Sequence, residues 1–146
     1  MLKTIKNYFF SAFREIFLYH HSSLEFRAKT YAVLIASSSE PLSQYQTTLE
    51  KISHEIYTDS DRAEALILTV KEYIQGVYAK KNRVEEVLLL EMIRELRQIP
   101  RYALKIEPEH LERLKECTQN RDSKIYQDRI IEFLKVKRTE YRELKR

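Results

Sequence analysis

The stretch NRVEEVLLLEMIRELRQIP, residues 82–100, carries a helix start signal, an apolar body and a stop signal. Asn82 and Glu85 have the spacing of an N-terminal cap, and Pro100 ends the segment because proline cannot continue a helix. Between them, VLLLEMI (87–93) places apolar side chains nearly all round a helical axis. A surface helix needs only an apolar stripe, so this pattern predicts a helix surrounded by other helices.

Similar signals recur on both sides of this stretch, and no linker or β alternation separates them. Gly76 stands where a helix C′ residue would, a position that glycine often fills in the left-handed conformation. A single all-α domain over residues 1–146, a compact bundle of about seven helices, is therefore predicted. The expected helices run over about 2–19, from the capping box Ser22 to Glu25 through 36, from Leu42 to Ile56, from the Thr58–Asp61 start to Gly76, over 82–99, from Glu107-Pro108 through 117, and from Asp122 or Ser123 almost to Arg146.

The composition excludes several classes of protein. The chain holds one glycine, whereas phosphate-binding loops and dinucleotide fingerprints need several. The single cysteine, Cys117, cannot form an internal disulfide, which fits a reducing compartment. The longest uncharged run near the N-terminus, Asn7 to Phe13, is far shorter than the roughly 20 residues of a membrane-spanning helix, and no cleavage pattern follows. We expect a cytoplasmic chain that starts at Met1.

Charge is unevenly distributed along the chain. Lys and Arg exceed Asp and Glu by five to two over 1–30 and by eight to four over 123–146, while 31–122 holds thirteen against sixteen. A basic end suits an anionic surface or the acidic middle of another molecule, although solvated helix faces have the same composition. In the basic C-terminal helix (123–146), Glu140 and Glu143 lie at helical spacing from basic residues and would pair with them. Nucleic acid is for that reason a disfavoured partner.

The aromatic-rich N-terminal segment (1–21) includes NYFFSAFREIFLYHH (7–21), and its helix has an unusually wide apolar face. At 100° per residue, its apolar side chains fill an arc of about 200°, twice what a core usually needs. Three interpretations are open. The last helix covers this face with its own apolar stripe; or the face binds a protein, as aromatic patches commonly do; or it rests on anionic lipid. The stripe of the last helix consists of Tyr126, Ile130, Phe133, Leu134 and Tyr141.

No catalytic or metal-binding pattern stands out. His54-Glu55 begins like a zinc-protease motif, but Thr58 occupies the place of the second histidine. Glu107 and His110 have the spacing of one half of a di-iron site, but the chain has no second such pair, so we interpret them as a helix cap and a first-turn side chain. No enzyme activity and no cofactor are expected.

Two stretches, AVLIASSSEPLSQYQTTLEKI (32–52) and RYALKIEPEHLERL (101–114), resemble the two turn-and-helix segments of the TerB-like tellurite-resistance domain. The resemblance spans most of residues 23–120 and implies an all-helical bundle with two similar halves. The acidic metal-binding positions of that family are replaced in both turns, and its glycines are absent. The resemblance therefore implies the fold without the metal. The replacing residues are Ser39, Glu40 and Gln46 in the first turn and Ala103, Leu104 and His110 in the second.

The sequence predicts a non-catalytic interaction module that binds a partner protein, or itself, through the N-terminal helix. The alternative is a peripheral membrane protein resting on anionic lipid at the inner face of the membrane. The basic C-terminal helix would add charge to either contact. The residues expected to form the contact are Phe9, Phe10, Phe13, Phe17, Lys3, Lys6, Arg14, Lys135, Lys137 and Arg138.

Overall fold

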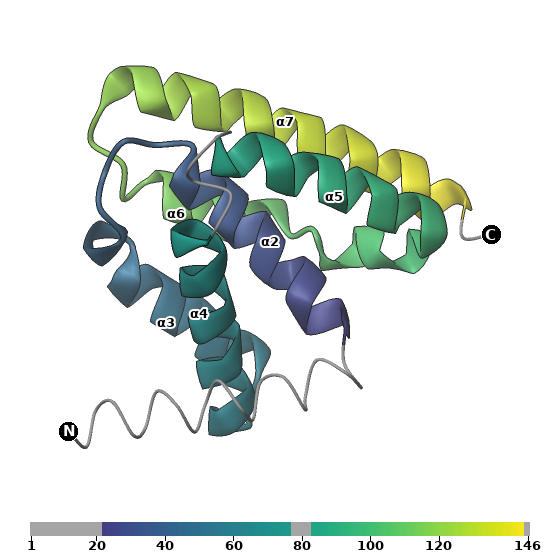
Figure 1. Cartoon of the computed structure of the whole chain (residues 1–146), viewed down its shortest axis with the longest axis horizontal. Coiled ribbons are helices and arrows are strands. Elements are labelled where there is room, and N and C mark those ends of the chain that lie inside the picture. The colour runs from purple at the N-terminus through teal and green to yellow at the C-terminus, as the bar shows by residue number, and fades with distance from the viewer. Residues whose placement is uncertain (1–21, 77–82, 145–146) are drawn as a thin grey trace.

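The computed structural model describes residues 22–76 and 83–144, which form an all-α bundle without a β-strand among them (Figure 1). The helix predicted over 2–19 lies outside these residues. The predicted fold class is confirmed. A short 3₁₀ helix between α5 and α6 was not predicted; it begins at Pro100, whose ring ends α5. The elements are α2 (Ser22–Ala36), η1 (Leu42–Gln44), α3 (Gln46–Ile56), α4 (Ser60–Gln75), α5 (Val84–Gln98), η3 (Pro100–Lys105), α6 (Pro108–Lys115) and α7 (Arg121–Leu144).

Helix α2 is the central element of the bundle. It crosses the middle of the molecule in Figure 1 and contacts α4, α5, α6, α7 and η3. Every residue from Phe26 to Ile35 is buried, including the polar side chains of Arg27, Lys29 and Thr30. A helix with neighbours on all sides has no solvent face, so α2 holds the position that the sequence assigns to α5.

The prediction that α5 is surrounded by other helices is wrong. Its buried apolar side chains repeat every four residues along one line, and this line faces α2 and η3. Leu90 lies on the opposite side and is 67% exposed, whereas Leu88 is fully buried. The consecutive leucines point in different directions because successive residues of a helix are about 100° apart. The buried line consists of Val84, Leu88, Met92 and Leu96.

Helix α7 packs on η3 and α6, with fewer contacts to α2. Three members of its predicted stripe, Ile130, Leu134 and Tyr141, are buried in the common core. Tyr126 is half-buried, and Phe133 is 37% exposed. Three of the five stripe residues of α7 therefore find their partners within the described bundle.

The helix ends agree with the sequence in part. The Asp59 carboxylate accepts the backbone N–H of Asp61 at 2.9 Å and caps α4 within the predicted start. The cap of α7 is Asn120, whose side chain accepts the N–H of Ser123 at 2.9 Å, rather than Asp122 or Ser123. Gly76 follows α4 as predicted, but its φ of −71° and ψ of 176° are extended rather than left-handed.

Candidate functional site

Two buried cations on α2 organise the polar interior of the bundle. Arg27 forms an ion pair with Glu107, the residue that precedes α6. Lys29 forms ion pairs with Glu95 and, at 3.3 Å, with Glu91, both on α5. A buried charge is tolerated only when a partner compensates its lost hydration. Each cation therefore ties the central helix to one neighbour.

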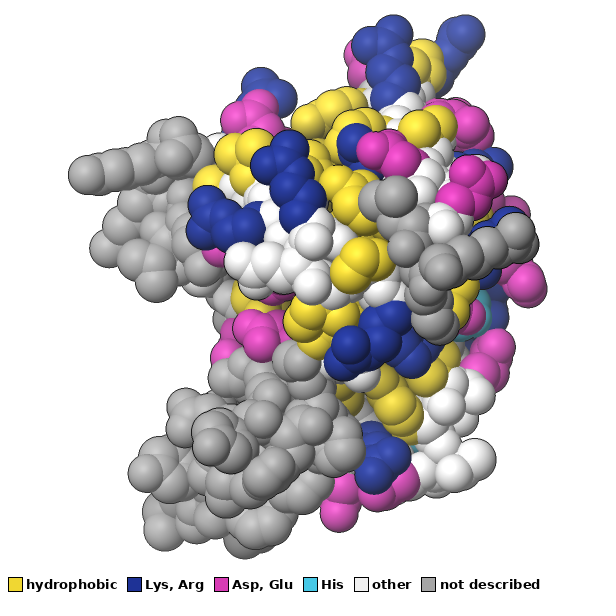
Figure 2. Space-filling view, turned by 90° about the vertical axis from the view of Figure 1, so that its right-hand side faces the viewer, with side chains coloured by type: hydrophobic (Ala, Val, Ile, Leu, Met, Phe, Trp, Pro, Cys, Tyr) yellow, Lys and Arg dark blue, Asp and Glu magenta, His cyan; other side chains and the backbone are white. Residues whose placement is uncertain are grey.

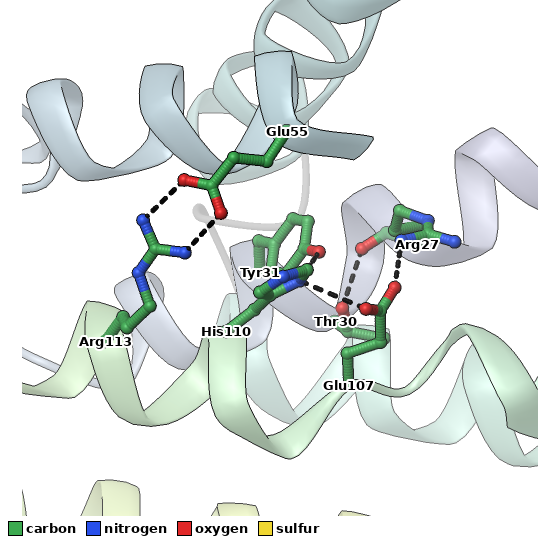
Figure 3. A network of polar contacts seen from close by, with 7 residues as sticks. All are labelled: Arg27, Thr30, Tyr31, Glu55, Glu107, His110 and Arg113. Carbon is green, nitrogen blue, oxygen red and sulfur yellow. Dashed lines mark hydrogen bonds and ion pairs between the residues drawn. The ribbon is translucent and has the colours of Figure 1, made fainter. Parts of the chain in front are cut away.

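Glu107 joins Arg27 to a second buried group (Figure 3). Its Oε2 lies 3.5 Å from Nδ1 of His110, and the same nitrogen lies 3.0 Å from the Tyr31 hydroxyl oxygen. The Thr30 hydroxyl donates to the carbonyl of Arg27 at 2.7 Å. Burial raises the pKa of Tyr31 well above its ordinary value, so its hydroxyl stays protonated. Glu107 occupies the N-cap position of α6, as interpreted, although its side chain makes no cap hydrogen bond; His110 lies in the first turn, as expected.

This network resembles an acid–base constellation, but its geometry is that of a structural tie. Tyr31 and Glu107 both approach the same nitrogen of His110, so the ring does not link one to the other through its two nitrogens. A general acid or base must also reach a bound substrate. The described cavities, of about 510 and 480 Å³, are lined by other residues. We assign the network to the docking of α6 on α2.

A second tie holds α6 to α3. The two terminal nitrogens of Arg113 donate to the two carboxylate oxygens of Glu55 at 2.8 and 2.9 Å (Figure 3). This bidentate pair is exposed, and it lowers the pKa of Glu55. Ties to α2 and α3 together fix the orientation of α6.

The second buried cluster surrounds Lys29. The Tyr73 hydroxyl on α4 donates to the carboxylate of Glu25 on α2. The Lys29 amine lies 5.6 Å from the centre of the Tyr73 ring. Burial acts against the charge of Lys29, but the ion pairs with Glu95 and Glu91 outweigh it and raise the pKa of the amine. Burial and Glu25 raise the pKa of Tyr73 as well. The cluster therefore joins α2, α4 and α5 while the Lys29 amine is charged and the Tyr73 hydroxyl is protonated.

The cavity of about 510 Å³ lies where α2 ends and α5 and α7 begin. Its volume is in the range of small-molecule sites. However, the Ser37 and Ser38 hydroxyls in its wall donate to α2 carbonyls at 2.6 and 3.0 Å. Glu40 at its rim accepts the backbone N–H groups of Gln119 and Asn120 at 2.9 and 3.1 Å. Much of the polar wall is therefore committed to the fold, and we assign no ligand to the cavity.

The structure describes three of the ten predicted contact residues. Lys135 and Lys137 form ion pairs with Glu132 and Glu140 of the same helix, at 3.1 and 3.4 Å. The expected pairing of Glu140 is confirmed. Nε of Arg138 is buried without a hydrogen-bond partner among the described atoms. The other seven predicted residues, Lys3, Lys6, Phe9, Phe10, Phe13, Arg14 and Phe17, lie outside the described residues.

The buried cations of α2 were not predicted from the sequence. Two signals point to them: Arg27 and Lys29 interrupt an apolar segment, and Glu91 and Glu95 repeat at helical spacing on one face of α5. Within residues 22–76 and 83–144, no three His, Cys, Asp or Glu side chains are placed to hold a metal ion. The helices described there are also too short or too polar to cross a bilayer.

Comparison of the chain with protein-family models, characterised proteins and solved structures gave no match. The TerB-like resemblance therefore stays a prediction.

Proposed function

We propose that the protein is a non-catalytic interaction module. It binds a partner protein, or a second copy of itself, through the aromatic face of the helix predicted over 2–19. That face carries Phe9, Phe10, Phe13 and Phe17. Large aromatic side chains are the usual anchors of protein interfaces, because each one buries a large apolar area at a small cost in conformational entropy.

The observation that carries the proposal is the packing of α7. The sequence offers the apolar stripe of this helix as an internal cover for the aromatic face. In the structure, Ile130, Leu134 and Tyr141 are buried, and α7 packs on η3 and α6. The stripe thus has other partners, which supports an external partner for the aromatic face.

Anionic lipid is the second candidate occupant of the same helix. It is favoured by Lys3, Lys6 and Arg14, which accompany the phenylalanines along the segment. Each basic residue near an anionic surface contributes about 1 kcal/mol. Helix α7 adds less than its composition suggests, because Lys135 and Lys137 are paired with glutamates of their own helix. A protein partner is therefore our first proposal.

The test compares the full-length protein with a variant that combines Phe13→Ser and Phe17→Ser. Phe133→Ser, which removes a partly exposed ring from α7, is the control. Sedimentation velocity over a range of concentrations measures self-association, and urea denaturation measures stability. A binding face that is free in the monomer tolerates the double change with less than about 1 kcal/mol of lost stability.

The outcomes separate the interpretations. Self-association that only the double variant loses supports binding of a second copy. If the full-length protein is a monomer and the double variant unfolds at the same urea concentration, the result supports a different protein as the partner. A loss of about 3–5 kcal/mol per phenylalanine would show an internal core helix and overturn the proposal. Flotation with anionic liposomes that fades at high salt, and that the double variant lacks, would support anionic lipid in place of a protein partner.

A further inference from the structure

Helix α5 separates its charges between its two sides. Glu91 and Glu95 face the central helix, where both form ion pairs with Lys29. Arg94 and Arg97 are exposed. The sequence of α5 is mildly acidic, but two of its carboxylates turn inward and share one buried amine. The side of α5 that faces solvent is consequently cationic near its C-terminal end.

Leu90 and the arginines that follow it form what we call the α5 stripe: Leu90, Arg94, Arg97 and Arg101. The spacings of four and three residues from Leu90 to Arg97 place the first three on one line of the helix. Arg101 follows in η3, where its guanidinium lies 5.5 Å from the centre of the Tyr102 ring.

The α5 stripe is open to solvent. Leu90 is 67% exposed, more than any other large apolar side chain of the described residues, and all three arginines are exposed as well. None of the ion pairs found among the described residues involves these arginines. Figure 2 views the molecule from the side where α5 ends and η3 begins, and hydrophobic side chains there lie open between Lys and Arg side chains.

We propose that the α5 stripe docks an acidic, amphipathic helix of a partner protein. One apolar side chain of that helix packs on Leu90, and its carboxylates pair with Arg94, Arg97 and Arg101. Guanidinium groups bind carboxylates through two parallel hydrogen bonds, which sets orientation as well as charge. An apolar anchor flanked by charges at three- and four-residue spacing is the usual pattern of helix-on-helix recognition.

The composition of the stripe favours a protein over other anionic partners. Binding of single-stranded nucleic acid relies on aromatic rings for base stacking, and none of the four stripe residues is aromatic. A lipid surface needs a broad apolar face, whereas the stripe offers one leucine. The α5 stripe shares no residue with segment 2–19, so the two proposals succeed or fail independently.

The test measures binding of a fluorescein-labelled synthetic peptide to the full-length protein by fluorescence anisotropy. The peptide is an amphipathic helix of about five turns with a leucine stripe flanked by glutamates. A matched peptide carries lysines in place of the glutamates. We expect the acidic peptide alone to bind, more weakly at high salt. Arg94→Glu combined with Arg97→Glu should weaken binding about tenfold or more, and Leu90→Ser severalfold.

Arg129→Glu is the matched control, since Arg129 is an exposed arginine of α7 and should leave binding unchanged. Circular dichroism and urea midpoints verify that every variant is folded. Absence of binding at about 1 mM peptide would overturn the proposal. So would equal weakening by Arg129→Glu, an unchanged affinity in Leu90→Ser, or tighter binding of a single-stranded oligonucleotide or anionic vesicles. Sedimentation that shows self-association through Arg94 and Arg97 would replace the partner with a second copy.

Discussion

Helix α2 holds the central position that the sequence assigns to α5. In α2, ten consecutive residues are buried, although Arg27, Lys29 and Thr30 are among them. In α5, an apolar run reaches the surface, and Leu90 is 67% exposed. The number of neighbours around a helix decides its burial, and apolar content alone does not. A charged side chain is accepted in the interior when a neighbour supplies the opposite charge.

The two cations of α2 illustrate how this works. Arg27 and Lys29 are two residues apart and therefore about 200° apart around the axis. They reach opposite neighbours, α6 through Glu107 and α5 through Glu95. These two side chains thus form ion pairs with neighbouring helices instead of facing solvent.

The largest expected effect comes from removing the amine of Lys29. Lys29→Ala leaves Glu91 and Glu95 without their cation in a partly buried site, so we expect a loss of about 3–5 kcal/mol in the free energy of unfolding. Urea denaturation measures it. Lys51→Ala, on the exposed side of α3, is the control and should change little. Equal effects of the two substitutions would contradict the structural role of Lys29.

The next effect concerns the buried line of α5. Leu88 is fully buried in the core, so Leu88→Ala should cost about 2–5 kcal/mol through lost burial and the cavity left behind. The midpoint of urea denaturation should fall with little change in its slope. A loss below about 1 kcal/mol would show that this line of α5 does not face the core.

Alkaline pH should lower the free energy of unfolding through the side chains packed around α2. The pKa values of Lys29, Tyr31 and Tyr73 are all raised in the folded chain. Above about pH 10 the unfolded chain releases these protons while the folded chain keeps them, so stability falls as pH rises. Each such group contributes up to about 1.4 kcal/mol per pH unit.

Urea midpoints between about pH 9 and pH 11 measure this slope, and Tyr73→Phe should reduce it by the share of one proton. A slope that Tyr73→Phe leaves unchanged would show that the Tyr73 hydroxyl is not protected by the fold.

Leu90 provides a matched substitution on the opposite side of α5. Leu90→Ala repeats the chemistry of Leu88→Ala two residues further along α5, but at a side chain that is 67% exposed. We expect a change of no more than about 0.5 kcal/mol, measured by the same urea titration. A cost comparable to that of Leu88→Ala would mean that α5 is surrounded, as its sequence suggests.

The candidate sites were less predictable than the fold. Glu107 and His110 stand out in the sequence by their spacing, but the sequence does not show that their partners are Arg27 and Tyr31, about 80 residues earlier. Spacing rules describe neighbours on one helix, whereas these contacts join different helices. The α5 stripe was not predicted for the same reason. Glu91 and Glu95 turn inward because they pair with Lys29 of α2.

Local patterns in the sequence are sufficient to predict the helical class, the boundaries of most helices and the apolar stripe of α7. These features follow from local physics: capping residues, proline, and a hydrophobic period close to that of the helix. The folded arrangement of the helices is needed to show which helix is central, which charges are buried and which leucine stays in solvent. Those outcomes depend on contacts between segments far apart in the chain, where an ion pair or a neighbouring helix offsets what each segment favours alone.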